Sequence, residues 1–107
     1  MAKKKHPQII ELEKAWGIEI KLHEYAENNK EIIQLVLNNK GINTLEPLKN
    51  LTNLIHLDLS KNIINCINGL EKLTKLRELN LYKNSIHEIN GLYNLTNLNY
   101  LHLGSNK

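Results

Sequence analysis

The sequence repeats itself every 22 residues from Ile32 onward. Leucine or isoleucine stands at positions 1, 4, 6, 11, 14, 17 and 20 of every complete copy. The complete copies span residues 32–53, 54–75 and 76–97, and a partial copy spans residues 98–107. One such unit has too few apolar side chains to bury its own core, so the copies must stack against one another. The period therefore predicts an array of stacked coils.

Composition supports this prediction, because the chain holds 20 Leu, 13 Ile and 17 Asn but no Phe. Each copy follows the pattern LxxLxLxxNxIxxIxxLxxLxx, with Leu and Ile interchangeable at the apolar positions. This pattern resembles the leucine-rich repeat family, and its length is similar to the repeats of a regulatory subunit of protein phosphatase 1. The resemblance covers residues 32–107, about seventy per cent of the chain. It implies an α/β fold, a right-handed solenoid with a parallel concave sheet and short 3₁₀ or irregular convex segments.

The alternation of apolar and polar residues early in each copy predicts one short strand per coil. Further along each copy, apolar residues recur every three positions, which is typical of a 3₁₀-like return segment. The predicted strands cover residues 34–37, 56–59, 78–81 and 100–103.

Asparagine recurs at position 9, as Asn62, Asn84 and Asn106. A buried amide both donates and accepts hydrogen bonds, so stacked copies are expected to form a ladder along the backbone. Lys40 takes this position in the first copy. We expect the lysine to be tolerated there because the ladder has no neighbour on that side.

The N-terminal part of the chain lacks the repeat, and we divide it into two segments. Residues 1–7 are expected to be a basic flexible tail. Residues 8–31 are expected to form an α/β cap over the first coil, with a helix over residues 8–16 ending at Gly17. Alternation from Ile18 to Leu22 predicts a strand after the helix. Trp16 is expected to pack against the first coil, and an exposed partner anchor is the alternative.

At the other end, the partial copy stops just after Asn106. Its apolar residues, Leu98, Leu101 and Leu103, are expected to lie under an open end with an unpaired strand edge. Exposing such side chains forfeits about 1.5–3 kcal/mol each. We consider truncation of a longer protein, self-association through this edge, and a tolerated frayed end.

The resemblance implies that the residues at positions 3 and 5, with positions 7 and 8 beside them, line the concave face. Leucine-rich-repeat proteins commonly bind other proteins on this face. Tyr82 and Tyr100 are expected to be neighbours there, and tyrosine is a favoured interface anchor. Simple solvated strand positions are the alternative. The candidate partner-binding residues are Gln34, Val36, His56, Asp58, Glu78, Asn80, Tyr82, Tyr100 and His102.

We therefore expect a non-catalytic protein–protein interaction module whose partner is another protein. Four strands span only about 15 Å, whereas a standard interface buries about 800 Å² on each partner. Binding on this face alone is thus expected to be weak or to recruit further surface. The alternatives are a truncated or self-associating structural fragment, including a homodimer through the C-terminal end, and a phosphatase-regulatory subunit by analogy.

Other functional classes find little support in the sequence. No metal-ligand spacing such as HExxH or CxxC occurs, and the solitary Cys66 is expected on the convex side, so we expect no enzyme, metal or cofactor. The net charge is only +3 and no basic stripe is present, which argues against nucleic acid. No apolar run reaches membrane length and no secretory signal is evident, so we expect a cytoplasmic protein that binds no membrane.

Overall fold

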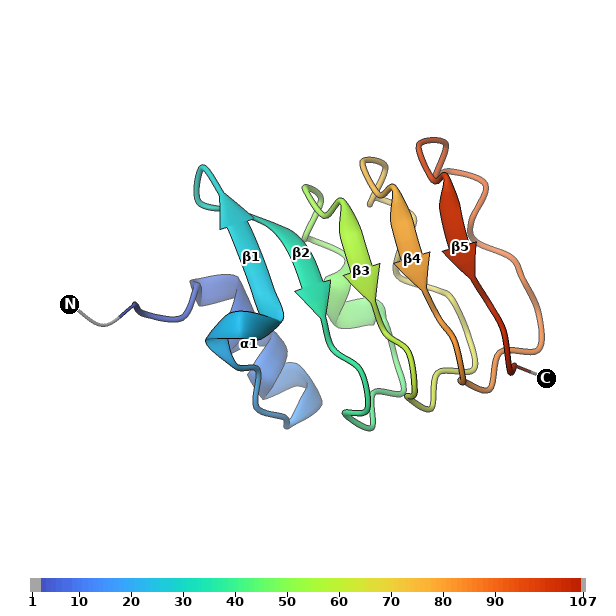
Figure 1. Ribbon diagram of the computed structural model, residues 1–107, viewed down its shortest axis with the longest axis horizontal. Coiled ribbons are helices and arrows are strands. Elements are labelled where there is room, and N and C mark those ends of the chain that lie inside the picture. Colours follow the sequence, from blue (N-terminus) through green and yellow to red (C-terminus); the bar gives the residue numbers. More distant parts are fainter. Residues whose placement is uncertain (1–2, 107) are drawn as a thin grey trace.

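The computed structural model describes residues 3–106, which form a single five-stranded sheet with helical and irregular segments behind it (Figure 1). The sheet order, β1-β2-β3-β4-β5, follows the order of the strands along the chain. Residues 1–2 of the predicted tail and Lys107 of the last copy lie outside the described residues. The elements are α1 (Pro7–Trp16), η1 (Leu22–Glu24), β1 (Tyr25–Asn28), β2 (Glu31–Val36), η2 (Glu46–Leu48), β3 (His56–Asp58), β4 (Glu78–Asn80) and β5 (Tyr100–His102).

From β2 onward, each strand pairs in parallel with the strand one repeat later. Gln34 lies beside His56, His56 beside Glu78, and Glu78 beside Tyr100. The strands β3, β4 and β5 begin where the sequence predicts. β2 begins earlier, at Glu31, because its first residues pair with β1. The copies therefore stack in register, and equivalent side chains form rows across the sheet.

Most of the repeated leucines and isoleucines form one continuous core between the sheet and the return segments. Ile89, at position 14 of the third copy, is 63% exposed. The strand leucines Leu35, Leu57 and Leu79 are at most 2% exposed. Fully burying one leucine stabilises the fold by about 1.5–3 kcal/mol, so the stacked rows provide the main stabilising contribution.

The predicted asparagine ladder is present, and Asn62 shows its geometry. The side-chain oxygen of Asn62 accepts hydrogen bonds from the backbone N–H groups of Lys40 and Ile42, each at 3.0 Å. Its amide donates to the carbonyls of Leu37 and Leu59 at 3.0 and 2.9 Å. The arrangement recurs in the next two coils. Each asparagine therefore joins its own coil to the preceding one.

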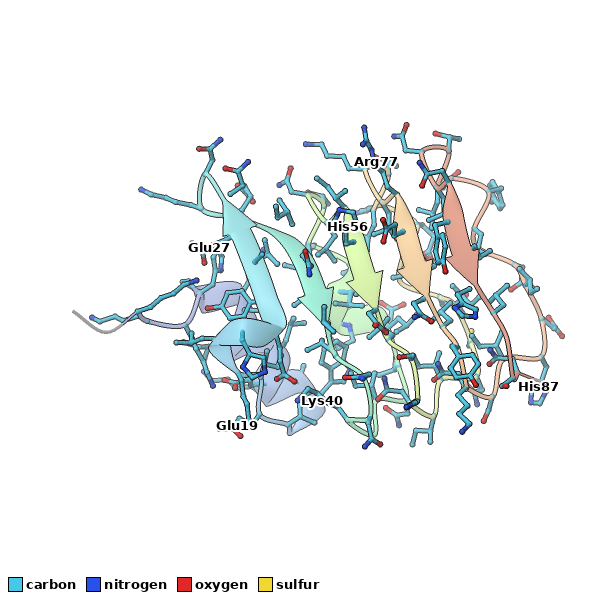
Figure 2. All side chains as sticks on the ribbon, viewed as in Figure 1. Glu19, Glu27, Lys40, His56, Arg77 and His87 are labelled. Carbon is cyan, nitrogen blue, oxygen red and sulfur yellow. The ribbon has the colours of Figure 1, made fainter. Side chains whose placement is uncertain are left out.

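Lys40 occupies the ladder position in the first coil and bonds to the cap instead. Its ammonium lies 3.0 Å from the Glu24 carboxylate and donates to the carbonyl of Glu19 at 3.1 Å (Figure 2). Burial by itself raises the pKa of Glu24, but hydrogen bonds from the Lys21 backbone N–H and from Lys40 outweigh it. The net result is a lowered pKa, because both contacts favour the ionised carboxyl. The lysine thus anchors the first coil to the cap.

The return segments have the predicted 3₁₀ character. In the first coil the N–H of Leu48 donates to the carbonyl of Leu45, and the N–H of Leu51 donates to that of Leu48. The second of these bonds recurs in the later coils, where the N–H groups of Leu73 and Leu95 donate to the carbonyls of Leu70 and Leu92. Gly69 lies in the second return segment at φ 113°, where an added Cβ would come within 2.8 Å of the Leu45 backbone. Glycine is therefore needed there for the coils to approach this closely.

The cap begins with α1, and part of the predicted tail belongs to it. The ring nitrogen Nδ1 of His6 accepts a hydrogen bond from the Gln8 N–H at 3.0 Å, and Pro7 is the first helical residue. The helix ends at Gly17, which adopts the left-handed conformation at φ 66°. Trp16 is half-buried against the core, and its indole N–H donates to the carbonyl of Thr44 at 2.9 Å. α1 therefore packs on the first coil.

Glu13 ties the end of the helix to the segment that follows. Its carboxylate accepts a hydrogen bond from the backbone N–H of Ile20 at 2.8 Å and pairs with the ammonium of Lys5. The Ile20 bond, and then the Lys5 bond, lower the pKa of Glu13. The bond to Glu13 in turn raises the pKa of Lys5.

The cap strand lies later in the sequence than the alternation from Ile18 to Leu22 predicts. Ile20 is fully buried, but its N–H bonds to the Glu13 side chain instead of a neighbouring strand. Leu22 begins the 3₁₀ turn η1. The strand that forms is β1, which runs antiparallel to β2 and places Tyr25 beside Leu35. The position of the cap strand is therefore set by pairing with β2 and not by the local alternation of apolar and polar residues.

Candidate binding face

The concave face carries a groove of about 510 Å³ that runs across four strands. Strand residues alternate between the two faces of a sheet, so the polar residues beside each buried leucine project into this groove. Of the nine predicted binding residues, Tyr82 and His102 do not line it. Leu35 and Leu57, which the repeat assigns to the apolar positions, also border the groove between the polar rows. The lining residues are Gln34, Leu35, Val36, His56, Leu57, Asp58, Glu78, Asn80 and Tyr100.

Two acidic side chains dominate the charge of the groove. Glu78 lies between His56 on β3 and Tyr100 on β5, and its Oε2 is 3.4 Å from Nδ1 of His56 (Figure 2). Asp58 occupies the next concave position along β3. Its Oδ1 accepts a hydrogen bond from the Ser60 N–H at 2.9 Å, which fixes the direction of the carboxylate. Asp58 is therefore held in place.

Asn80 is held in the same way as Asp58, one strand along. Its Oδ1 accepts a hydrogen bond from the backbone N–H of Tyr82 at 2.9 Å. This bond leaves the amide nitrogen as the donor available to a ligand in the groove. The floor of the groove thus presents one fixed carboxylate and one fixed amide on neighbouring strands.

An aromatic cluster lies at the C-terminal end of the concave face, partly outside the groove. The rings of Tyr82 and His102 are 5.2 Å apart between centroids, and Tyr100 meets His102 edge-on at 6.3 Å. The predicted pairing of the two tyrosines is thus mediated by His102. Gly104 occupies position 7 of the last copy, and an added Cβ there would come within 3.2 Å of Tyr82. A glycine at position 7 makes room for this ring.

Cys66 is exposed and lies away from the concave groove. It borders a small hollow with His87 and Glu88, and the histidine was not considered from the sequence. Figure 2 places His87 apart from His56. Between residues 3 and 106, no group of three metal-binding side chains is close enough to hold an ion.

The last described coil leaves apolar side chains exposed. Leu101 is 40% exposed, whereas Leu57 and Leu79 occupy the same position in earlier coils and are nearly fully buried. Leu98 and Leu103 are half-buried at the same end. In the described part of the chain, no helix is both long enough and apolar enough to span a bilayer.

Comparison with solved structures relates the chain to two internalins of Listeria monocytogenes. Internalin C2 is 36% identical over 69% of this chain, with a TM-score of 0.67. The internalin InlF is 40% identical over 62% of this chain, with a TM-score of 0.57. Internalins are leucine-rich-repeat proteins. The chain has a leucine-rich-repeat fold.

The similarity covers only part of each internalin. The chain spans 33% of the internalin C2 chain and 19% of the InlF chain. No protein-family model and no curated protein matches the sequence. The similarity to phosphatase-1 regulatory repeats stays a prediction, because neither neighbour is such a subunit.

Proposed function

We propose that this leucine-rich-repeat chain is a non-catalytic module that binds another protein on its concave face. The observation that carries this proposal is the groove of about 510 Å³, bordered by the exposed ring of Tyr100. Tyrosine combines apolar area with a hydroxyl and has few rotatable bonds, so it contributes strongly to interfaces. The similarity to internalins, which are interaction proteins, supports the same function.

The geometry of the face also supports recognition over catalysis. The groove is an open strand surface that excludes water poorly, whereas catalytic charges act most strongly in dry sites. Its fixed groups, Asp58 and Asn80, are held by backbone N–H groups in positions suited to directional hydrogen bonds. Pre-ordered groups of this kind lose little entropy when a partner binds.

The test is capture of partners from native cell lysate by the wild-type chain and by a Tyr82→Ala/Tyr100→Ala variant. We expect the variant to keep its fold and to lose at least about 2 kcal/mol of binding free energy, because an interface tyrosine that acts as a hot spot contributes this much. Tyr93→Ala is the matched control, because Tyr93 is 84% exposed and does not line the groove. Equal capture by all three proteins would disprove binding on the concave face.

A second candidate function is self-association through the C-terminal end of the solenoid. The exposed Leu101 and the unpaired outer edge of β5 favour it, since each inner strand pairs on both sides. The other edge strand, β1, exposes the polar residues Glu27 and Asn28, so two copies would meet end to end through β5. This assembly would bury the leucines that the last coil leaves exposed.

A further inference from the structure

We infer that the partner inserts an arginine side chain between Asp58 and Glu78 on the concave face. This inference rests on the proposed function and specifies its chemistry. The occupant is a protein segment with an exposed arginine. The charge of the groove, its unused hydrogen-bond acceptors and the position of one aromatic ring favour this side chain.

The charge of the groove is opposite to the charge of the whole chain. The net charge of the protein is +3, yet the groove lining contains two carboxylates and, among the described residues, no lysine or arginine. Arg77 lies just before β4 and is not part of the lining (Figure 2). A cationic side chain is therefore the complementary ligand, and an anionic partner such as nucleic acid is repelled.

The two carboxylates retain unused hydrogen-bond acceptors. Asp58 uses Oδ1 to accept from Ser60, and Glu78 approaches His56 only through Oε2. Within residues 3–106, the second oxygen of each carboxylate has no protein donor. The two residues lie on adjacent strands, diagonal to one another. A planar guanidinium, with five N–H donors, can bind both carboxylates at once.

The ring of Tyr100 distinguishes arginine from lysine. Tyr100 lies directly beside Glu78, is 56% exposed, and has its ring oriented by edge-on contact with His102. A guanidinium bound to Glu78 would therefore lie next to the ring. Arginine stacks on aromatic faces while keeping its hydrogen bonds, and the compact ammonium of lysine satisfies one carboxylate at a time.

The experiment uses NMR spectroscopy of the ¹⁵N-labelled chain with three small probes. The probes are arginine, lysine and citrulline, each with an acetylated α-amino group and an amidated carboxyl group. Citrulline has the shape of arginine without its charge. We expect saturable shifts at Asp58, Glu78 and Tyr100 with the arginine probe. Lysine should bind at least about threefold more weakly, and citrulline at least about tenfold.

The matched variants are Asp58→Asn/Glu78→Gln and, with the same change in charge, Glu11→Gln/Glu88→Gln. Asparagine at position 58 keeps the oxygen that accepts from Ser60, so the turn is preserved. We expect the first variant to lose arginine binding by at least about tenfold and the second to retain it. Equal binding of arginine and citrulline, equal binding of arginine and lysine, or equal losses in both variants would overturn the inference.

This inference can fail while the proposed function stands. If the tyrosine variant loses its captured partner and Asp58→Asn/Glu78→Gln retains it in full, the concave face binds a protein but not through arginine. If the tyrosine variant and Asp58→Asn/Glu78→Gln both lose the captured partner, and the arginine probe binds as expected, the arginine site is supported.

Discussion

At the residue scale, the buried asparagines join each coil to its neighbour. Asn62 and Asn84 are less than 9% exposed, and each satisfies backbone groups of two coils. A buried amide costs free energy unless it is fully hydrogen-bonded, and these two are. Stability across the coil boundaries therefore depends on single side chains as well as on leucine packing.

We expect Asn84→Ala to lower the free energy of unfolding by about 2–4 kcal/mol. The change removes the bonds to Leu59, Leu81 and Ile64. The buried N–H of Ile64 loses its acceptor, and the two carbonyls keep one bond each, from Asn62 and Asn106. Urea denaturation followed by circular dichroism measures the loss. Asn65→Ala is the control, because Asn65 is exposed, and a similar loss in both variants would contradict the role of the ladder.

The concave residues could be assigned from the sequence only in part. Positions beside each leucine had to face the groove, since strand side chains alternate. The alternation does not show that Tyr82 turns toward His102 and away from the groove lining, because that contact depends on the space beside Gly104.

At the scale of the elements, charged side chains hold the cap together and join it to the repeats. Glu13 joins the helix to the segment containing Ile20, and Glu24 joins η1 to Lys40 of the first coil. Both carboxyl groups have pKa values lowered by these contacts. Each contact is therefore strongest when the carboxyl group is ionised.

We expect the protein to lose stability as the pH falls through and below 4.5, the ordinary pKa of a glutamate. A lowered pKa in the folded state means that the unfolded chain binds protons first, so acid favours unfolding. Urea unfolding at about pH 6 and about pH 3.5 measures this effect. Glu13→Gln/Glu24→Gln should reduce the difference, whereas Glu11→Gln, whose side chain is exposed, should leave it unchanged.

At the scale of the whole molecule, the two ends of the stack differ in kind. The cap strand β1 covers the first coil by antiparallel pairing with β2, and its own exposed residues, Glu27 and Asn28, are polar. The last coil exposes Leu101 and the edge of β5. Unpaired strand edges beside apolar side chains favour association with another chain.

If self-association occurs at this end, Leu101→Lys should convert a concentration-dependent dimer into a monomer without unfolding it. The lysine would place a charge at the centre of the edge, and two such charges would repel in a symmetric pair. Light scattering over a range of concentrations measures the mass. Ile63→Lys is the control, because Ile63 is 58% exposed in an inner coil. A wild-type monomer at every concentration would refute the assembly.

The sequence by itself determined the repeat, its register and most of the buried positions. Ile89, at an apolar position of the third copy, is exposed nonetheless. Every coil must present the same apolar residues to its neighbours, so the period of 22 residues is also the pairing distance between strands. Asparagine at position 9 was predictable for the same reason, because each copy must satisfy the same backbone groups.

Only the tertiary structure decided the cap and the detailed shape of the binding face. The sequence favoured a strand at Ile18 to Leu22, yet the strand forms at Tyr25–Asn28, where it can pair with β2. Likewise, Lys40 reaches Glu24 only once the cap folds over the first coil. These features occur once and join residues that are distant in the sequence, so the repeat pattern cannot predict them.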